Sequence, residues 1–143
     1  MIQGRFGNTT GRPYVNGRLL LPRLKFSTNL SFLVDTGADV SALMPADGIK
    51  LGINYRVLIN SKVVGCMGGN TNCFQEDAVL IFDEPNRNLT RYYLIKIMIP
   101  PVSPPLMKTP SIIGRDILDR WRINYDPNRN SLKFTVRSAD HTI

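Results

Sequence analysis

The stretch Phe32-Leu-Val-Asp-Thr-Gly-Ala-Asp39 places one carboxylate, Asp35, at the end of an apolar run and directly before a glycine. The apolar and β-prone residues from 30 to 34 predict a buried strand that ends at Asp35, and the glycine favours a sharp turn after it. An acid at a strand end in this arrangement is aimed at a confined space. The Asp-Thr-Gly triplet occurs once in 143 residues, so chemistry that needs two such acids requires a second copy of the chain.

Composition predicts a single all-β domain. A chain of 143 residues with 43% hydrophobic content can build one core but divides poorly into two. Ten prolines and eleven glycines lie among short apolar runs, which favours strands and turns over long helices.

The formal charge of +7 raises the possibility of a nucleic-acid partner, because clustered Lys and Arg bind phosphates. The basic residues are scattered from Arg5 to Arg137 among acids, however, so we expect a solvated basic surface and no nucleic acid. No stretch is apolar enough to cross a membrane, and the first residues lack the apolar region of an export signal. We therefore expect a soluble protein, with the cytoplasm as the favoured location.

The remaining pattern predicts a series of hairpins and one short helix. Residues 12–22 read as a hairpin whose type I′ turn is Asn16-Gly17. A strand is expected over 55–65, with a second hairpin turn at 67–70. Residues 74–82 and 89–99 should pair around the loop 84–88, and 123–125 and 132–136 around the turn 126–130. Between them, the proline-rich stretch 100–110 excludes regular structure.

The helix is expected just after this proline-rich stretch. Ile113, Ile117, Leu118 and Trp121 fall at i, i+4, i+5 and i+8, on one face of a short helix.

Three ordered features give the chain a family resemblance. Val34-Asp35-Thr36-Gly37-Ala38-Asp39, a glycine-rich hairpin and Ile112-Ile113-Gly114-Arg115-Asp116-Ile117-Leu118 together resemble the retropepsins, the single-lobe, homodimeric relatives of pepsin. The resemblance extends over most of the chain and implies an acid-protease barrel lobe, with one short C-terminal helix, assembled as a symmetric homodimer. It divides the chain into an N-terminal extension (1–11), a protease domain (12–137) and a C-terminal tail (138–143).

The resemblance implies an aspartic endopeptidase with Asp35, Thr36 and Gly37 at its catalytic centre. Peptide hydrolysis without a covalent intermediate needs one carboxylate to activate water and another to donate a proton. Two aspartates about 3 Å apart share one proton, which makes one a base and the other an acid. By the same resemblance, the Thr36 hydroxyl bonds to the partner's loop and Gly37 brings backbone N–H groups to the carboxylates. Alone, an Asp-Thr-Gly turn could also merely cap a strand.

By the same resemblance, Arg115 reaches Asp39 within one subunit and forms a partly buried ion pair, for which arginine is suited because its planar guanidinium can bind a carboxylate bidentately. The alternative is a surface arginine at a helix start, where the helix dipole disfavours it. Asp116 follows Arg115 where the retroviral pattern usually has Asn, which is closer to cellular and bacterial members of the family. An acid at a helix N-terminus has favourable electrostatics in any case.

The glycine-rich hairpin would fold over the substrate as a flap, with Gly65, Gly68 and Gly69 giving it mobility and Met67 at its tip. An ordinary surface hairpin is the alternative. If the turn is Gly69-Asn70, Cys66 lies opposite Cys73; if it is Met67-Gly68, as the family register suggests, the two do not oppose. Without an export signal, we expect the two cysteines to be unbridged.

The expected partners are a second copy of the chain and an extended, mainly hydrophobic polypeptide, with the chain's own precursor as one candidate. By resemblance, the cleft is lined by Ala38, Asp39, Gly65, Cys66, Met67, Gly68, Gly69, Thr109 and Ile112. No cofactor and no metal are expected, because two cysteines and one distant histidine match no zinc spacing. An inactive peptide-binding or dimerisation module on the same fold, and a basic RNA-binding β-domain, are the competing interpretations.

Overall fold

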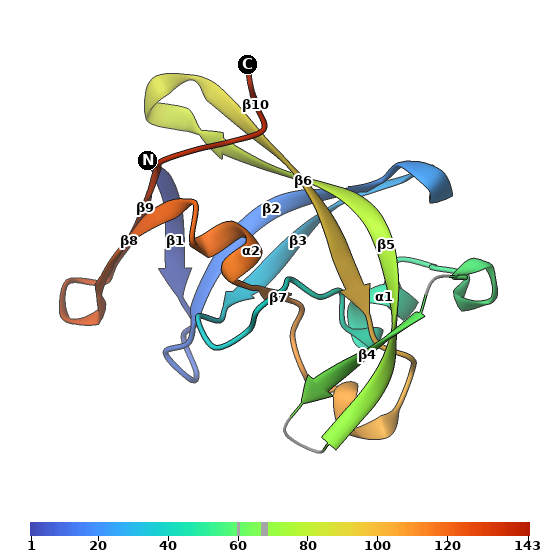
Figure 1. Cartoon of the computed structure of the whole chain (residues 1–143). Helices are drawn as coiled ribbons and strands as arrows, with labels where there is room; N and C mark the ends of the chain where they lie inside the picture. The colour runs from blue at the N-terminus through green and yellow to red at the C-terminus, as the bar shows by residue number, and fades with distance from the viewer. Residues whose placement is uncertain (60, 67–68) are drawn as a thin grey trace.

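The computed structural model describes residues 1–59, 61–66 and 69–143, and for 61–66 and 69–71 it describes the backbone alone. Strands dominate, as expected (Figure 1). The strands are β1 (Ile2–Phe6), β2 (Pro13–Leu21), β3 (Phe26–Val34), β4 (Ser61–Cys66), β5 (Gly69–Glu84), β6 (Leu89–Ile99), β7 (Ile112–Ile113), β8 (Trp121–Asp126), β9 (Ser131–Val136) and β10 (His141–Thr142). The α-helices are α1 (Pro45–Lys50) and α2 (Arg115–Leu118). Single 3₁₀ turns are η1 (Pro22–Leu24), η2 (Tyr55–Val57), η3 (Pro85–Arg87), η4 (Pro104–Leu106) and η5 (Pro127–Arg129).

One sheet contains all these strands. Its main path runs β10-β6-β5-β2-β1-β9-β8, β3 pairs with both β2 and β7, and β4 pairs with β5. Most neighbours are antiparallel hairpin partners, but β3 and β7 are parallel and far apart in sequence. The chain therefore returns after about half its length to lie beside the strand that carries Asp35.

The core is aromatic at its centre. Trp121 packs against Phe82 and Phe134 with ring centroids 4.9 and 5.0 Å apart, and its indole N–H donates to the Tyr93 hydroxyl at 2.7 Å. That bond satisfies two polar groups that would otherwise be buried without partners. The apolar face predicted for the short helix is buried as expected, because Ile113, Ile117, Leu118 and Trp121 all belong to this core. The helix itself is shorter than that face, since β7 precedes α2 and Trp121 begins β8.

The expected hairpin at Asn16-Gly17 is wrong. β2 continues through both residues, and the chain reverses at η1, after which Lys25 adopts a left-handed conformation with φ of 51°. Gly17 has a packing role instead: a Cβ atom there would lie 2.6 Å from the Phe82 ring. A glycine that reads locally as a turn is needed here because an aromatic ring from β5 lies against the backbone of β2.

The predicted turns at 84–88 and 126–130 are confirmed in place. β5 and β6 pair around η3, and β8 and β9 pair around η5. Both turns have the sequence Pro-Asn-Arg-Asn, and the last residues, Asn88 and Asn130, have φ of 53° and 49°. Proline sets the first φ of the turn, and asparagine tolerates the left-handed conformation better than most residues.

Elsewhere the structure differs from the expected elements or adds to them. The strand predicted over 55–65 is shorter: residues 55–57 form η2, and β4 begins at Ser61. A second short helix, α1, was not predicted. Residues 2–6, expected to precede the protease domain, form β1, which pairs with β2 and β9 and buries Ile2. In the tail, His141 and Thr142 pair with β6.

Candidate active site

Asp35 follows the last residue of β3, between two other strands. β3 pairs with β2 on one side and with β7 on the other, where Val34 lies beside Ile113. The backbone N–H of Leu33 donates to Ser111 O at 2.8 Å, and that of Asp35 donates to Ile113 O at 3.1 Å. The position of the carboxylate is therefore fixed by backbone bonds to a segment more than 75 residues away.

The turn after Asp35 directs an N–H group at its carboxylate. The N–H of Gly37 donates to Asp35 Oδ1 at 3.0 Å, and the N–H of Ala38 donates to the Asp35 carbonyl at 3.2 Å. A Cβ at position 37 would lie 3.3 Å from Oδ1, which is tight for such a contact. Asp35 is half-buried, while Thr36 and Gly37 are exposed, so the acid lies at the surface of the single chain.

The residues after this turn are attached to the start of α2. The N–H groups of Arg115 and Asp116 donate to the carbonyls of Ala38 and Asp39, at 2.8 and 3.2 Å. The contact is closest at Gly114, where an added Cβ would lie 2.6 Å from the carbonyl carbon of Val40. Only glycine fits between these two backbones. We call residues 35–42 together with 111–116 the floor of the site.

A buried serine and an acid hold the floor from inside, and sequence reasoning missed both roles. The N–H and hydroxyl of Ser41 donate to Asp116 Oδ2 and Oδ1 at 2.9 and 2.7 Å, and Ser41 Oγ accepts the Gly114 N–H at 3.0 Å. The sequence related Asp116 to the helix dipole and to the family pattern, but not to Ser41. A small polar residue shortly after the Asp-Thr-Gly motif and an acid after the Gly-Arg pair are the signals that could have predicted this link.

A second serine continues the same pattern on the other side of the floor. The Ser111 hydroxyl donates to Asp47 Oδ2 at 2.6 Å and accepts the Met44 N–H at 3.0 Å. Ser111 is fully buried, and Asp47 lies in the first turn of α1. The unpredicted helix α1 therefore supplies an acid that anchors the floor.

Asp39 and Arg115 form an ion pair within the chain. Their side chains are 81% and 48% exposed in the single chain, so this pair is not the partly buried one that we expected. An exposed pair of this kind stabilises a single folded chain by about 1 kcal/mol at most.

The β4–β5 hairpin has a register that decides between the two predicted turns. Cys66 pairs with Gly69 and Gly65 with Asn70, whereas Cys73 lies opposite Lys62. The Gly69-Asn70 turn is therefore wrong, and this register does not place Cys66 opposite Cys73. Met67 and Gly68, the expected tip, lie outside the described residues, as does the side chain of Cys66.

A small apolar cluster joins the floor to the base of this hairpin. Ala42, Met44, Cys73 and Met98 are buried together, with Val40 and Ile112 packed against them. The expected cleft residue Ile112, which is part of the floor, packs against this cluster, and its backbone bridges to Ala42. Thr109 lies further away along the chain, in the turn that follows η4, where its N–H donates to Leu106 O at 3.1 Å.

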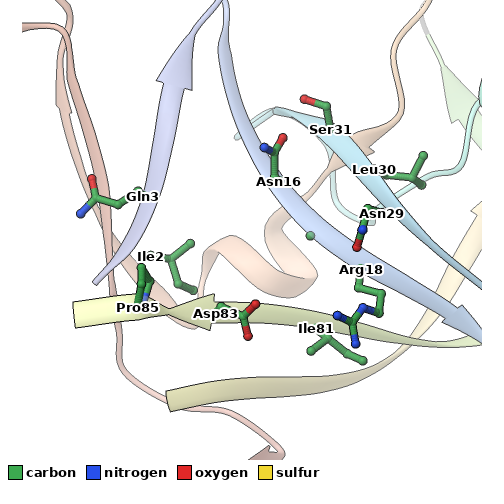
Figure 2. Close-up of a pocket in the computed structure, with 11 residues that line it drawn as sticks. Ile2, Gln3, Asn16, Arg18, Asn29, Leu30, Ser31, Ile81, Asp83 and Pro85 are labelled. Carbon is green, nitrogen blue, oxygen red and sulfur yellow. The ribbon is translucent and has the colours of Figure 1, made fainter. Parts of the chain in front are cut away.

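A separate open groove lies away from Asp35 (Figure 2). It is lined from the middle of β2 and β3 and from β1 and β5, by Ile2, Gln3, Asn16, Gly17, Arg18, Asn29, Leu30, Ser31, Ile81, Asp83 and Pro85. Figure 2 shows amide, hydroxyl and charged side chains around it. None of the expected site residues lies on this groove.

The described residues contain neither a candidate metal centre nor a helix that could span a membrane. No three His, Cys, Asp or Glu side chains among them gather into a group that could hold a metal ion. None of the helices in the same part of the chain is long and apolar enough to cross a membrane.

Comparisons with known proteins agree with the fold. Residues 12–125 match the model of the retroviral aspartyl protease family. A retropepsin-like aspartic protease from Rickettsia conorii superposes with a TM-score of 0.61 at 20% identity, over 94% of this chain and 88% of that one. EIAV protease complexed with the inhibitor HBY-793 gives a TM-score of 0.48 at 24% identity, over 79% of this chain and 90% of that one. No curated protein matches the sequence.

Proposed function

The chain belongs to the retroviral aspartyl protease family, and from this we propose that it is an aspartic endopeptidase whose dyad is Asp35 from each of two identical subunits. The observation that supports this most is the position of Asp35. It directly follows β3 at the surface, accepts the Gly37 N–H and is fixed by a backbone bond to Ile113 in β7. Because the chain carries one Asp-Thr-Gly triplet, the second carboxylate has to come from another copy.

The proposed chemistry is general acid–base catalysis on a water molecule. With the two carboxylates about 3 Å apart, the pair holds one proton, so one acid takes a proton from water while the other gives one to the peptide. Titration then belongs to the pair as a unit. We assign Thr36 to contacts across the axis, and Gly37 to the N–H donation that it already makes within one chain.

The proposed substrate is an extended polypeptide with hydrophobic side chains beside the scissile bond. Such a segment can add as a strand between the floor and the β4–β5 hairpin, which we propose to act as the flap. The apolar cluster that includes Ala42, Met98 and Ile112 supports a preference for apolar side chains. Ala38, Asp39 and Thr109 are further cleft residues in this proposal, as are Gly65, Cys66, Met67, Gly68 and Gly69.

The decisive variant is Asp35→Asn, which keeps the size of the side chain and removes the acid. Cleavage of an unfolded test protein should fall by at least about 10³-fold between about pH 4 and pH 7, because both halves of the dyad are lost. The dimer, measured by sedimentation, should persist. Asp119→Asn, an exposed acid just after α2, is the matched control and should keep its activity. Cleavage that survives in Asp35→Asn would reject the dyad.

The competing interpretation is an inactive peptide-binding or dimerisation module. It would be favoured if the wild-type chain cleaves neither the test protein nor itself at concentrations where it is dimeric. Peptide binding without turnover under those conditions would establish it.

A further inference from the structure

One face of the sheet carries basic side chains that have no acidic partner. In β1, β8 and β9, the residues Ile2, Trp121 and Phe134 are buried in the core, and successive residues of a strand point to opposite faces. The opposite face of these three strands is therefore open to solvent. It carries Gln3, Arg5, Arg122, Asn124, Lys133 and Thr135. Within the part of the chain that the structure describes, none of its three cations forms an ion pair.

The three cations follow a diagonal line across three neighbouring strands, which Figure 1 shows next to one another. Lys133 lies opposite Gln3 of β1 and opposite Asn124 of β8. Arg5 and Arg122 are each two residues along from those partners, in the directions that make each a diagonal neighbour of Lys133. Diagonal neighbours in an antiparallel pair lie about 7–8 Å apart. The line therefore presents three positive charges at regular steps.

The same face continues into the open groove of Figure 2. The groove forms where two strands separate along β2, because β1 pairs with residues 13–15 of β2 and β5 with residues 18–20. Its volume is about 570 Å³, within the size range of ligand pockets. Figure 2 shows Gln3 on the β1 side and Asp83 on the β5 side. Most of the polar groups between them are amides and a guanidinium, on Asn16, Arg18 and Asn29.

Arg5 connects the line of cations to the groove. Its guanidinium lies over the Tyr14 ring, 5.0 Å from the ring centre, and donates to the hydroxyl of Ser31, which lines the groove. Arg18 adds a fourth cation that forms no ion pair with the described residues. The line and the groove are therefore one continuous surface, which we call the basic face.

The acids on the basic face lie at its margins. Asp126, the last residue of β8, lies 3.7 Å from Arg129, which offsets its charge. Asp83, on the β5 rim of the groove, accepts the Thr90 hydroxyl at 2.9 Å. A second copy of the chain packed here about a two-fold axis would place cations against cations. Charge complementarity instead requires an anionic partner.

The side chains of the basic face suit a peptide better than a nucleic acid. Single-stranded nucleic acids are usually held by aromatic rings on which the bases stack. The described strands β1, β2, β3, β8 and β9 place one aromatic ring on this face, that of Tyr14, and Arg5 already lies over it. Amide side chains both donate and accept, as the N–H and C=O groups of a peptide do, and arginine binds carboxylates bidentately.

We propose that the basic face binds an acidic, extended segment of the polypeptide substrate, outside the catalytic cleft. Carboxylates of the segment pair with Arg5, Arg122 and Lys133, and its backbone amides bond to side chains in the groove. The inference rests on the proposed function, because that function makes the bound peptide a substrate. A substrate held at this second site reaches the cleft at a raised effective concentration, which lowers KM.

Binding is tested on the full chain with Asp35→Asn, so that no probe is cleaved. Fluorescence anisotropy compares a labelled peptide that contains a run of glutamates with the same peptide carrying glutamines instead. The acidic peptide should bind at least about tenfold more tightly, and its affinity should fall as salt is added. Equal affinities of the two peptides would overturn the proposal. So would binding of a single-stranded RNA oligonucleotide without binding of the acidic peptide, which would assign the face to nucleic acid.

Charge reversal tests the location of the site. In the same background, the double variant Arg18→Glu/Lys133→Glu places acids in the groove and in the line of cations, and should weaken binding of the acidic peptide by at least about tenfold. Lys133→Arg keeps the charge and should keep the affinity. Arg56→Glu, an exposed cation in η2, is the matched control. Thermal unfolding checks that the double variant is folded. A folded double variant that binds as tightly as the control would overturn the assignment.

Kinetics of the chain with its Asp35 acid test the link to the proposed function. Adding the acidic run to a peptide that the protein cleaves should lower KM by about tenfold with kcat unchanged, and the double variant should lose this difference between the two peptides. Binding of the acidic peptide by a chain that cleaves no peptide would reject the proposed function and keep the site. Cleavage with equal KM for both peptides, and no binding, would do the reverse.

Discussion

Two regions of the molecule each hold a carboxylate, but with different partners. One is the floor of the site, and the other is the end of the β5–β6 hairpin at η3, which we call the far end of the sheet. At the floor, Asp116 accepts the N–H and hydroxyl of Ser41 at 2.9 and 2.7 Å. At the far end, Glu84 is 2% exposed and bonds to Arg91 at 2.6 Å and to the amino group of Met1 at 2.9 Å. One acid is satisfied by neutral donors and the other by cations.

This difference matters because of what lies beside each acid. Neutral donors fix the geometry around Asp35 without placing another buried charge next to it. Bonds between opposite charges are stronger, but their contribution to stability follows pH. We therefore expect the two regions to respond differently to substitution and to pH.

The largest effect should come from Gly114→Ala in the floor. The added Cβ would lie 2.6 Å from the Val40 carbonyl carbon, so two backbones must separate. We expect a loss of about 3 kcal/mol in the free energy of unfolding, together with lower activity. Gly7→Ala is the control, because its added Cβ would lie 3.2 Å from the Tyr14 ring and 3.7 Å from both Arg12 O and Thr10 Oγ1, and it should cost under about 1 kcal/mol. Denaturant unfolding measures both, and equal losses would contradict the tight contact.

Ser41→Ala should cause the next largest loss in the free energy of unfolding. It removes the hydroxyl that donates to Asp116 and accepts from Gly114, which leaves buried groups unsatisfied and costs about 2 kcal/mol. Asp116→Asn should cost less, since the amide oxygen still accepts from Ser41. A stability for Ser41→Ala equal to that of the wild type would show that the floor does not depend on this link.

At the far end of the sheet, the contribution of Glu84 to folding stability should depend on pH. Burial, the largest influence, raises the pKa of Glu84, but the hydrogen bonds from the Met1 amino group and Arg91 outweigh it, so the pKa lies below its ordinary value of 4.5. A lowered folded-state pKa stabilises the fold above pH 4.5, and that contribution is lost as pH falls through the folded value.

Glu84→Gln should therefore lose less stability than the wild type when melting is compared at about pH 6 and about pH 3. If Glu84→Gln and the wild type lose stability equally over this range, the ionic bracing of the far end is not what titrates.

The smallest effect should come from a turn outside both regions. Lys25 has φ of 51°, a conformation that Asn88 and Asn130 adopt in the equivalent turns η3 and η5. Lys25→Asn should stabilise the fold by roughly 0.5 kcal/mol, because asparagine tolerates this conformation better. Asn130→Lys should lower stability by a similar amount, and thermal unfolding measures both. Opposite signs from these would contradict the conformational argument.

Local sequence predicted the parts of the fold that depend on neighbouring residues. The strand that ends at Asp35, the two Pro-Asn-Arg-Asn turns and the buried face of Ile113, Ile117, Leu118 and Trp121 were all predicted from short patterns. The Asn16-Gly17 turn was wrong for the opposite reason. Gly17 is needed because the Phe82 ring packs against it, and Phe82 is distant in the sequence, so no local pattern could reveal this role.

The candidate site divides in the same way. The motifs named Asp35, Gly37, Asp39 and Arg115, but they gave the ion pair more burial than the single chain provides. They missed the bonds of Ser41 with Asp116 and of Ser111 with Asp47, which join residues 75 and 64 positions apart. Helix α1 and the pairing of β1 with β9 were missed for the same reason.

By itself, the sequence determined that one acid ends an apolar strand before a glycine turn, and that this motif occurs once. Backbone conformation and hydrophobic period act over a few residues, so the printed order of residues is enough to read them. The tertiary structure decided what holds that acid in place. Those contacts come from segments that meet only after the chain has folded back on itself, where close packing and buried hydrogen bonds select the partners.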